Sequence, residues 1–327
     1  MERHRPGVTI TRSEDYRLLT GGGEFLDDRN MAGQAYAVMV RSPHAHARIG
    51  AIGTGEAGAM PGVLAILTGG DCREDGLGGL PCLDACQRRD GSAMVAPPHP
   101  ALPVERALYA GEAVAMVIAE TESVARRAAE AVAVNYETLA AVSGIEQAVA
   151  AGAPTVWPDF LDNECFHAAV GDGDAVAHAF VTAPHTVEQT LVNHRVLANS
   201  MEPRGYLGHY DTSTERFTLY GGVQSPHGLC AQLADHIFHL PLDRFRVVTG
   251  DVGGSFGMRG AIYVELVLVL WASRRLGRPV KWVASRSEGM ISDDHGRDNL
   301  SRAALALDRN GKFLALRVSV MANMGAY

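Results

Sequence analysis

No stretch of this sequence is apolar for the roughly 18 residues that a membrane-spanning helix needs. The longest candidate, residues 261–273, is interrupted by Tyr263 and Glu265. The N-terminus carries positive charges but no apolar core follows them, so it lacks the pattern of a secretory signal. We therefore expect a protein that stays in water, with the cytoplasm as its default location.

A surplus of positive charge is also absent. The formal net charge is −8 at pH 7, whereas nucleic acids and anionic membranes bind basic surfaces. Cysteine is scarce, and its positions form an odd set without the spacing of a disulfide framework, a zinc site or an iron–sulfur cluster. We expect ordinary reduced thiols at Cys72, Cys82, Cys86, Cys165 and Cys230.

What is present describes an ordinary globular protein, 47% hydrophobic and 20% charged, and 327 residues are enough for two domains. In the first part, the pattern predicts strands at 8–10, 34–40, 63–67, 113–119 and 134–141, a long surface loop at 72–100, and a helix capped by Thr121. Strand, helix and strand in that order predict a small α+β domain that closes near residue 142.

A connector with little periodicity follows at 143–175. The second part is expected to contain strands at 205–210, 216–221, 245–248 and 279–283 and helices at 229–238 and 261–276. Asn310 and Gly311 between apolar arms predict a hairpin. The expected fold class is therefore α+β, with a second domain that begins near residue 179.

The densest motif is the segment 250–257, GDVGGSFG, which contains four glycines in eight residues between an expected strand and an expected helix. Such a turn either needs positive φ angles or lets a group approach closer than a Cβ would allow. Its N–H groups, with the N-terminus of the following helix behind them, would form a cradle for phosphate or an oxo ligand. The dinucleotide-binding pattern fails at Val252, and no Gly-Lys-Ser or Gly-Lys-Thr occurs. A turn needed only for packing is the alternative.

Polar residues near other strand ends join this turn as candidates. Gln224 is predicted at a strand end on the same edge, and its neutral amide can donate to an oxo group without ionising. Glu202 and Arg204 precede another strand, and a surface salt bridge between them is the simplest interpretation. His227 is a candidate ligand, although capping or core histidines are more common.

Further motifs occur in a fixed order along the chain: TGGGEFLDD at 20–28, VRSPHAHARI at 40–49, YAGEAVA at 109–115, VNYE at 134–137, MEPR at 201–204, QSPH at 224–227 and GRPVKW at 277–282. Together with the glycine turn, they resemble the N-terminal portion of the large, molybdopterin-binding subunit of the xanthine dehydrogenase, aldehyde oxidase and carbon monoxide dehydrogenase family. The resemblance implies the family's α/β hammerhead domain at 19–142 and the first part of its mixed α/β molybdenum-cofactor-binding domain at 176–327. Residues 1–18 are expected to form an N-terminal entry segment.

The same resemblance implies the roles of site residues. The glutamine that matches Gln224 hydrogen-bonds an oxo ligand of molybdenum, and Gln224 and Phe256 are the implied contacts to the metal. Main-chain groups of the turn lie against the cofactor, at Gly253, Gly254, Ser255, Phe256 and Gly257. The implied cofactor is molybdenum–molybdopterin, with its cytosine dinucleotide form as an option, and neither an iron–sulfur cluster nor a flavin is expected in this chain.

The implied reaction is oxidative hydroxylation of an aldehyde, an N-heterocycle or a similar small substrate, or oxidation of carbon monoxide, with electrons leaving through partner subunits. Two departures from the family pattern bear on the site. Gly260 stands where xanthine-oxidising relatives have a substrate-binding glutamate, which disfavours purines. Ser255 stands where many relatives have glycine, which is tolerable only if this residue keeps an ordinary φ.

The sequence stops in the middle of the family pattern, so the general base and most pterin-binding residues are not in this chain. We therefore expect it to be inactive alone and to act with the missing C-terminal half of the large subunit, an iron–sulfur small subunit, and an FAD-binding medium subunit or another electron acceptor. Exposed apolar surface is expected near the C-terminus. The alternative is a non-catalytic homologue that serves only as an interaction or assembly fragment.

Overall fold

The computed structural model describes residues 12–160 and 162–327, so the strand expected at 8–10 lies outside the described residues. The strands are β1 (Ala35–Arg41), β2 (Ala47–Gly53), β3 (Val63–Thr68), β4 (Arg106–Ala107), β5 (Ala113–Ala119), β6 (Ala133–Thr138), β7 (His185–Asn193), β8 (Val196–Leu197), β9 (Gly205–Asp211), β10 (Arg216–Gly221), β11 (Phe245–Val248), β12 (Val280–Val283), β13 (His295–Gly296), β14 (Asn299–Leu307) and β15 (Phe313–Ala322). The helices are α1 (Asp15–Leu19), α2 (Gly55–Gly58), α3 (Gly69–Glu74), α4 (Glu122–Ala131), α5 (Ile145–Ala148), α6 (Gly173–Thr182), α7 (Pro226–Gln232), α8 (Val264–Leu276) and α9 (Arg286–Ser292).

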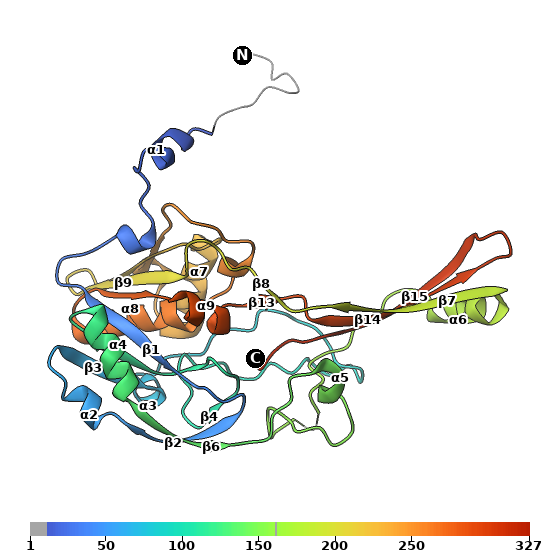
Figure 1. Cartoon of the computed structure of the whole chain (residues 1–327), viewed down its shortest axis with the longest axis horizontal. Helices are drawn as coiled ribbons and strands as arrows, with labels where there is room; N and C mark the ends of the chain where they lie inside the picture. The colour runs from blue at the N-terminus through green and yellow to red at the C-terminus, as the bar shows by residue number, and fades with distance from the viewer. Residues whose placement is uncertain (1–11, 161) are drawn as a thin grey trace, which may run out of the picture.

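A seven-stranded sheet forms the centre of the molecule, in the order β11-β10-β9-β12-β1-β5-β3. The two parts of the chain meet in this sheet, because β1 pairs with β12 in parallel, with Ala35 opposite Val280. The two predicted domains therefore share one continuous sheet (Figure 1). The domain limits at 142 and 176 stay predictions.

The main core lies between this sheet and α8. Residues 266–272 of α8 are fully buried, and the helix packs so closely on β9 that a Cβ on Gly208 would come within 2.6 Å of the Val269 backbone. Gly277 ends the helix with a φ of 65°, the left-handed conformation that glycine adopts most readily. The helix expected at 261–276 is therefore confirmed, although it begins at Val264.

The strand, helix and strand predicted in the first part of the chain are confirmed at residues 113–138. β5 has the expected bounds, Thr121 caps α4 by accepting a hydrogen bond from Val124 N, and β6 follows. The smaller sheet β4-β2-β6 lies beside the central one. The prediction of a long surface loop at 72–100 is wrong for its first residues, because α3 extends to Glu74 and contains the buried Cys72. All five cysteines are free thiols.

A separate three-stranded sheet, β15-β14-β7, extends away from the body of the molecule together with α6. We call these four elements the arm (Figure 1). Asn310 and Gly311 lie in the turn between β14 and β15, as predicted, and Gly311 has a φ of 80°. In the described part of the chain, no helix combines the length and apolar character needed to cross a membrane.

Candidate functional site

Two loops meet at one edge of the central sheet. β10 and β11 are parallel neighbours, with Tyr220 opposite Val248, so the loops that follow them leave the sheet on the same side. The first loop leads through Gln224 into α7, and the second is the glycine turn at 250–257. Gln224 N donates to Arg259 O at 3.1 Å and joins the two loops. The prediction that Gln224 and the glycine turn share an edge is confirmed.

The glycine turn has the backbone that its composition predicts. Gly254 and Gly257 have φ angles of 114° and 96°. Gly253 is needed for a different reason, because a Cβ there would lie 2.4 Å from Glu202 Cβ. Ser255 does not have a positive φ, which meets the condition set for a serine at this position.

Phe256 is the unusual residue of the turn. Its φ is 53°, a conformation that costs a non-glycine residue on the order of 1–3 kcal/mol and that clusters at functional sites. Its side chain is 81% exposed, so the ring is not held in this conformation by burial. The strained backbone and the exposed ring therefore belong to the surface of the candidate site.

The turn presents free hydrogen-bond donors. In residues 12–160 and 162–327, no hydrogen bond uses the main-chain N–H groups of Gly254, Ser255, Phe256 or Gly257. The preceding donor, Gly253 N, is bound by Glu202 Oε2 at 2.8 Å. Successive free N–H groups in a turn form a concave site for an anion or an acceptor oxygen.

The side chain of Gln224 lies beside Gly260, three residues after this turn. It is exposed, and its Oε1 lies 3.1 Å from the position that a Cβ on Gly260 would take. Within the described residues, its carboxamide forms no hydrogen bond to another side chain or to the backbone. A glycine at position 260 thus leaves the amide accessible to a bound group.

A buried ion pair holds the turn from behind. Arg259, whose side chain is 1% exposed, pairs with Glu202 at 3.0 Å. It also donates from Nε to Gly254 O at 2.9 Å and from Nη2 to Glu202 O at 2.7 Å. The surface salt bridge predicted between Glu202 and Arg204 is therefore wrong, because Glu202 has Arg259 as its partner.

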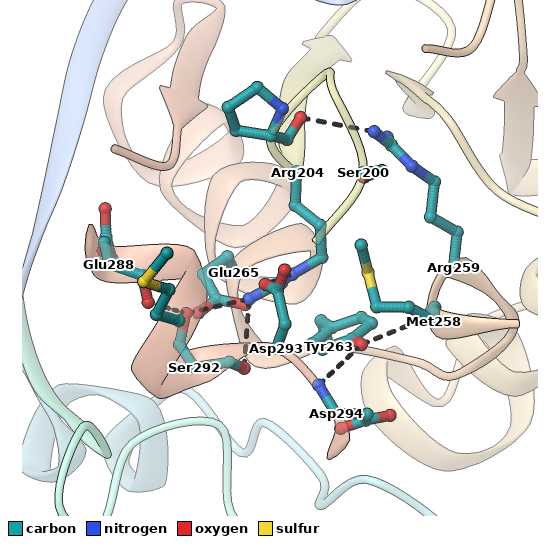
Figure 2. A network of polar contacts seen from close by, with 12 residues as sticks. Ser200, Arg204, Met258, Arg259, Tyr263, Glu265, Glu288, Ser292, Asp293 and Asp294 are labelled. Atoms are coloured by element: carbon teal, nitrogen blue, oxygen red, sulfur yellow. Dashed lines mark hydrogen bonds and ion pairs between the residues drawn. The ribbon is translucent and has the colours of Figure 1, made fainter. Parts of the chain in front are cut away.

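Arg204 belongs to a second buried network, shown in Figure 2. Its guanidinium is fully buried and pairs with Glu265 and Asp293, and Arg41 binds the other oxygen of Glu265 at 2.7 Å. Burial would raise the pKa of Glu265, but the guanidinium groups of Arg204 and Arg41 lower it to about 2. This network ties the start of β9 to α8, α9 and the end of β1.

The helix after the turn does not stand where the sequence suggested. A short 3₁₀ turn, η4 (Met258–Gly260), separates the glycine turn from α8. The hydroxyl of Tyr263, just before α8, donates to Met258 O at 2.8 Å and accepts from Asp294 N at 3.1 Å. The expectation of a helix N-terminus directly behind the turn is wrong, and the free donors come from the turn itself.

The polar groups of the site fit a bound group that carries acceptor oxygens. Main-chain N–H groups and a carboxamide can donate to such oxygens without a change of charge. Two buried polar atoms without partners, Ser255 Oγ and Arg259 Nη1, also lie in this region. In the described part of the chain, no cluster of three or more His, Cys, Asp or Glu side chains could hold a metal ion directly.

Comparisons with known proteins match both parts of the chain. Residues 20–140 match the family model described as aldehyde oxidase and xanthine dehydrogenase, a/b hammerhead domain. Residues 157–327 match the model described as molybdopterin cofactor-binding domain. Together the two models account for most of the sequence.

Individual relatives agree with these models. The nicotine 6-hydroxylase large subunit of Paenarthrobacter nicotinovorans is 33% identical over 98% of this chain and 38% of its own length. The carbon monoxide dehydrogenase large chain of Hydrogenophaga pseudoflava is 34% identical over 96% of this chain and 39% of its own. The structure of quinoline 2-oxidoreductase from Pseudomonas putida 86 superimposes with a TM-score of 0.89 at 32% identity, over 98% of this chain and 40% of that one. The chain thus spans well under half of the length of these relatives.

Proposed function

This chain belongs to the aldehyde oxidase and xanthine dehydrogenase family of molybdopterin-dependent oxidoreductases, and from that premise we propose that its glycine turn and Gln224 form one wall of a molybdopterin-cofactor site. The observation that carries the proposal is the run of free N–H groups from Gly254 to Gly257 beside the free amide of Gln224. These donors lie at the carboxyl ends of two parallel strands, where ligands commonly bind in sheets with such strands.

Each residue of the wall has a definite task in this proposal. When bound, the cofactor would supply two-electron redox chemistry at its molybdenum. Gln224 donates from its amide to an acceptor oxygen, and residues 254–257 donate from the main chain. Phe256 is the second residue beside the metal, through its main chain, and its exposed ring supplies an apolar surface that excludes water.

The family and the activities for which its members are named support one class of reaction. We propose oxidative hydroxylation of an aldehyde, an N-heterocycle or a similar small molecule, or oxidation of carbon monoxide. The relatives are named for nicotine, quinoline and carbon monoxide, which supports small and weakly polar substrates. Gly260 has no side chain to fill the space beside the Gln224 amide, and we propose that this space affects which substrates the site admits.

The rest of the site lies, in this proposal, in the part of the family's large subunit that these 327 residues do not cover, on this polypeptide or on another. That part would provide the general base and the opposite wall. An iron–sulfur small subunit and an FAD-binding medium subunit would accept the electrons. We place the complex in the cytoplasm.

The proposal is tested by the metal content of the assembled complex. The chain is co-expressed with the remaining region of the large subunit and with the partner subunits, and molybdenum is measured by elemental analysis. We expect a molybdenum-loaded complex, and mass spectrometry of the extracted pterin then reports whether it carries the cytosine dinucleotide. An assembled complex without molybdenum would contradict the proposal and favour the assembly-fragment alternative.

Gln224→Ala provides the matching test of the site. Loss of one preorganised donor at a reacting centre lowers turnover on the order of a hundredfold, whereas loss of an exposed amide changes stability by less than about 0.5 kcal/mol. We therefore expect a normal unfolding temperature with a strongly reduced kcat. Gln147→Ala, at an exposed glutamine in α5, is the control and should leave both unchanged. An unaltered kcat in Gln224→Ala would remove this residue from the site.

A further inference from the structure

We propose that Arg259 is the positioning residue of the candidate site: it holds the glycine turn and the Gln224 loop in register without touching the bound group. The inference rests on the proposed function and adds to it a residue outside the wall itself. Its basis is that Arg259 contacts both loops: its buried side chain binds the glycine turn, and its main-chain carbonyl binds the Gln224 loop.

The guanidinium of Arg259 donates to four acceptors, of which Gly254 O lies in the glycine turn and the other three belong to Glu202 and Pro203. Nε donates to Gly254 O at 2.9 Å, and Nη2 donates to the carbonyl and to a carboxylate oxygen of Glu202, at 2.7 and 3.0 Å. Glu202 in turn accepts from Gly253 N at 2.8 Å. The carbonyl of Gly254 is thus held from the back of the turn, while the N–H groups that follow it stay free.

The main chain of Arg259 fixes the second loop. Its carbonyl accepts from Gln224 N at 3.1 Å. Its side chain also packs against this loop, because a Cβ on Gly222 would lie 2.5 Å from Nη1. A displacement of Arg259 would therefore shift the free N–H groups and the Gln224 amide relative to each other.

The geometry of the guanidinium matters here more than its charge. A planar fork spreads its donors over acceptors that lie apart, from Gly254 O to Pro203 O, whereas the three donors of a lysine ammonium diverge from a single nitrogen atom. Nη1 is buried without a partner in the described residues, which is unfavourable because buried polar atoms normally form hydrogen bonds. The arginine is held in place although one of its donors is left unsatisfied.

Two substitutions separate positioning from charge. Arg259→Lys keeps the charge and removes the fork, and Gly222→Ala keeps the arginine and pushes against Nη1. Arg244→Lys is the control, because Arg244 forms an exposed ion pair with Glu215 and donates to Thr214 O. All are made in the assembled complex, and molybdenum content, unfolding temperature, kcat, KM and the electron paramagnetic resonance spectrum of the metal centre are measured.

We expect both site variants to keep about half or more of the wild-type molybdenum content and to fold, with an unfolding temperature that falls by only a few degrees, as is usual for a single buried substitution. Their kcat should fall on the order of tenfold to a hundredfold, as for small misplacements of reacting groups, while KM stays within about twofold. Their resonance spectra should be shifted in the same direction. The Arg244→Lys complex should match the wild type in every measurement.

Three results would overturn the inference. A wild-type kcat and spectrum in Arg259→Lys would show that the fork is not needed. Loss of fold and metal together in both site variants would make Arg259 a purely structural residue. A wild-type complex without molybdenum would overturn the proposed function and this inference with it, whereas the first two results leave the proposed function intact.

Discussion

Glu112 is a buried carboxyl whose environment favours its protonated form. It accepts hydrogen bonds from Leu108 N at 2.6 Å and from the hydroxyl of Tyr327 at 2.5 Å, and Tyr327 stacks on His99. Burial raises the pKa of Glu112 to about 7, because these hydrogen bonds to the carboxylate offset its loss of hydration only in part. Glu265, by contrast, lies between two arginines and stays ionised.

The raised pKa of Glu112 predicts that stability falls as pH rises. Because the folded-state pKa lies above the unfolded value, the contribution of this group is fully present below about pH 4.5 and is lost as pH passes through about 7. Between pH 5 and 8 this group should lower the free energy of unfolding, measured in urea, by a few kcal/mol, whereas His99, whose pKa burial lowers to about 4, acts in the opposite direction below about pH 6.5. Glu112→Gln should flatten this dependence, and Glu137→Gln, at an exposed carboxyl, should not. An equally steep dependence in Glu112→Gln would exclude Glu112 as its source.

At the scale of elements, glycine sets how closely α8 approaches β9. Ala at position 208 would place a methyl group within 2.6 Å of the Val269 carbonyl, so the helix or the strand must move. Gly208→Ala should lower the free energy of unfolding by about 1–3 kcal/mol, as overpacking does. Gly173→Ala is the matched control, because nothing lies within 4 Å of the added methyl, and its stability should be unchanged or rise by less than about 1 kcal/mol. Equal denaturation curves for the two variants would contradict the close packing.

The strands and helices with the clearest local signals could be predicted from the sequence. β5, β11 and the cap of α4 depend on apolar runs and on one threonine, so neighbouring residues suffice to identify them. The pairing of β1 with β12 joins residues far apart in the chain, and no local pattern carries that information.

The site shows the same division. The shared edge of Gln224 and the glycine turn could be predicted because each follows an expected strand, whereas the partners of Glu202 and Arg204 depend on tertiary contacts. Glu265 within an apolar helix was the available signal, since a buried carboxylate needs a cationic partner. The sequence does not say which arginine that partner is.

At the scale of the whole molecule, the arm exposes an apolar surface. Arg317 on β15 lies over the ring of Phe180 on α6, at 4.5 Å, so α6 covers that face of the sheet. Residues on either side of Arg317 point to the opposite face. Leu316 and Val318 there are 61% and 50% exposed, and Val187 on β7 is 60% exposed. The expectation of exposed apolar surface in the C-terminal part of the chain is confirmed.

This uncovered face predicts that the isolated chain associates in solution. Contiguous apolar surface of this kind favours contact with another protein surface over contact with water. Sedimentation velocity of the purified chain should show dimers or larger species, and Leu316→Lys combined with Val318→Lys should shift the distribution toward monomer, because buried unpaired charges disfavour the contact. Ser319→Lys adds one charge to the same strand on the face of Arg317, and it should leave the association unchanged. A wild-type chain that sediments as a single monomeric species would show that this face does not drive association.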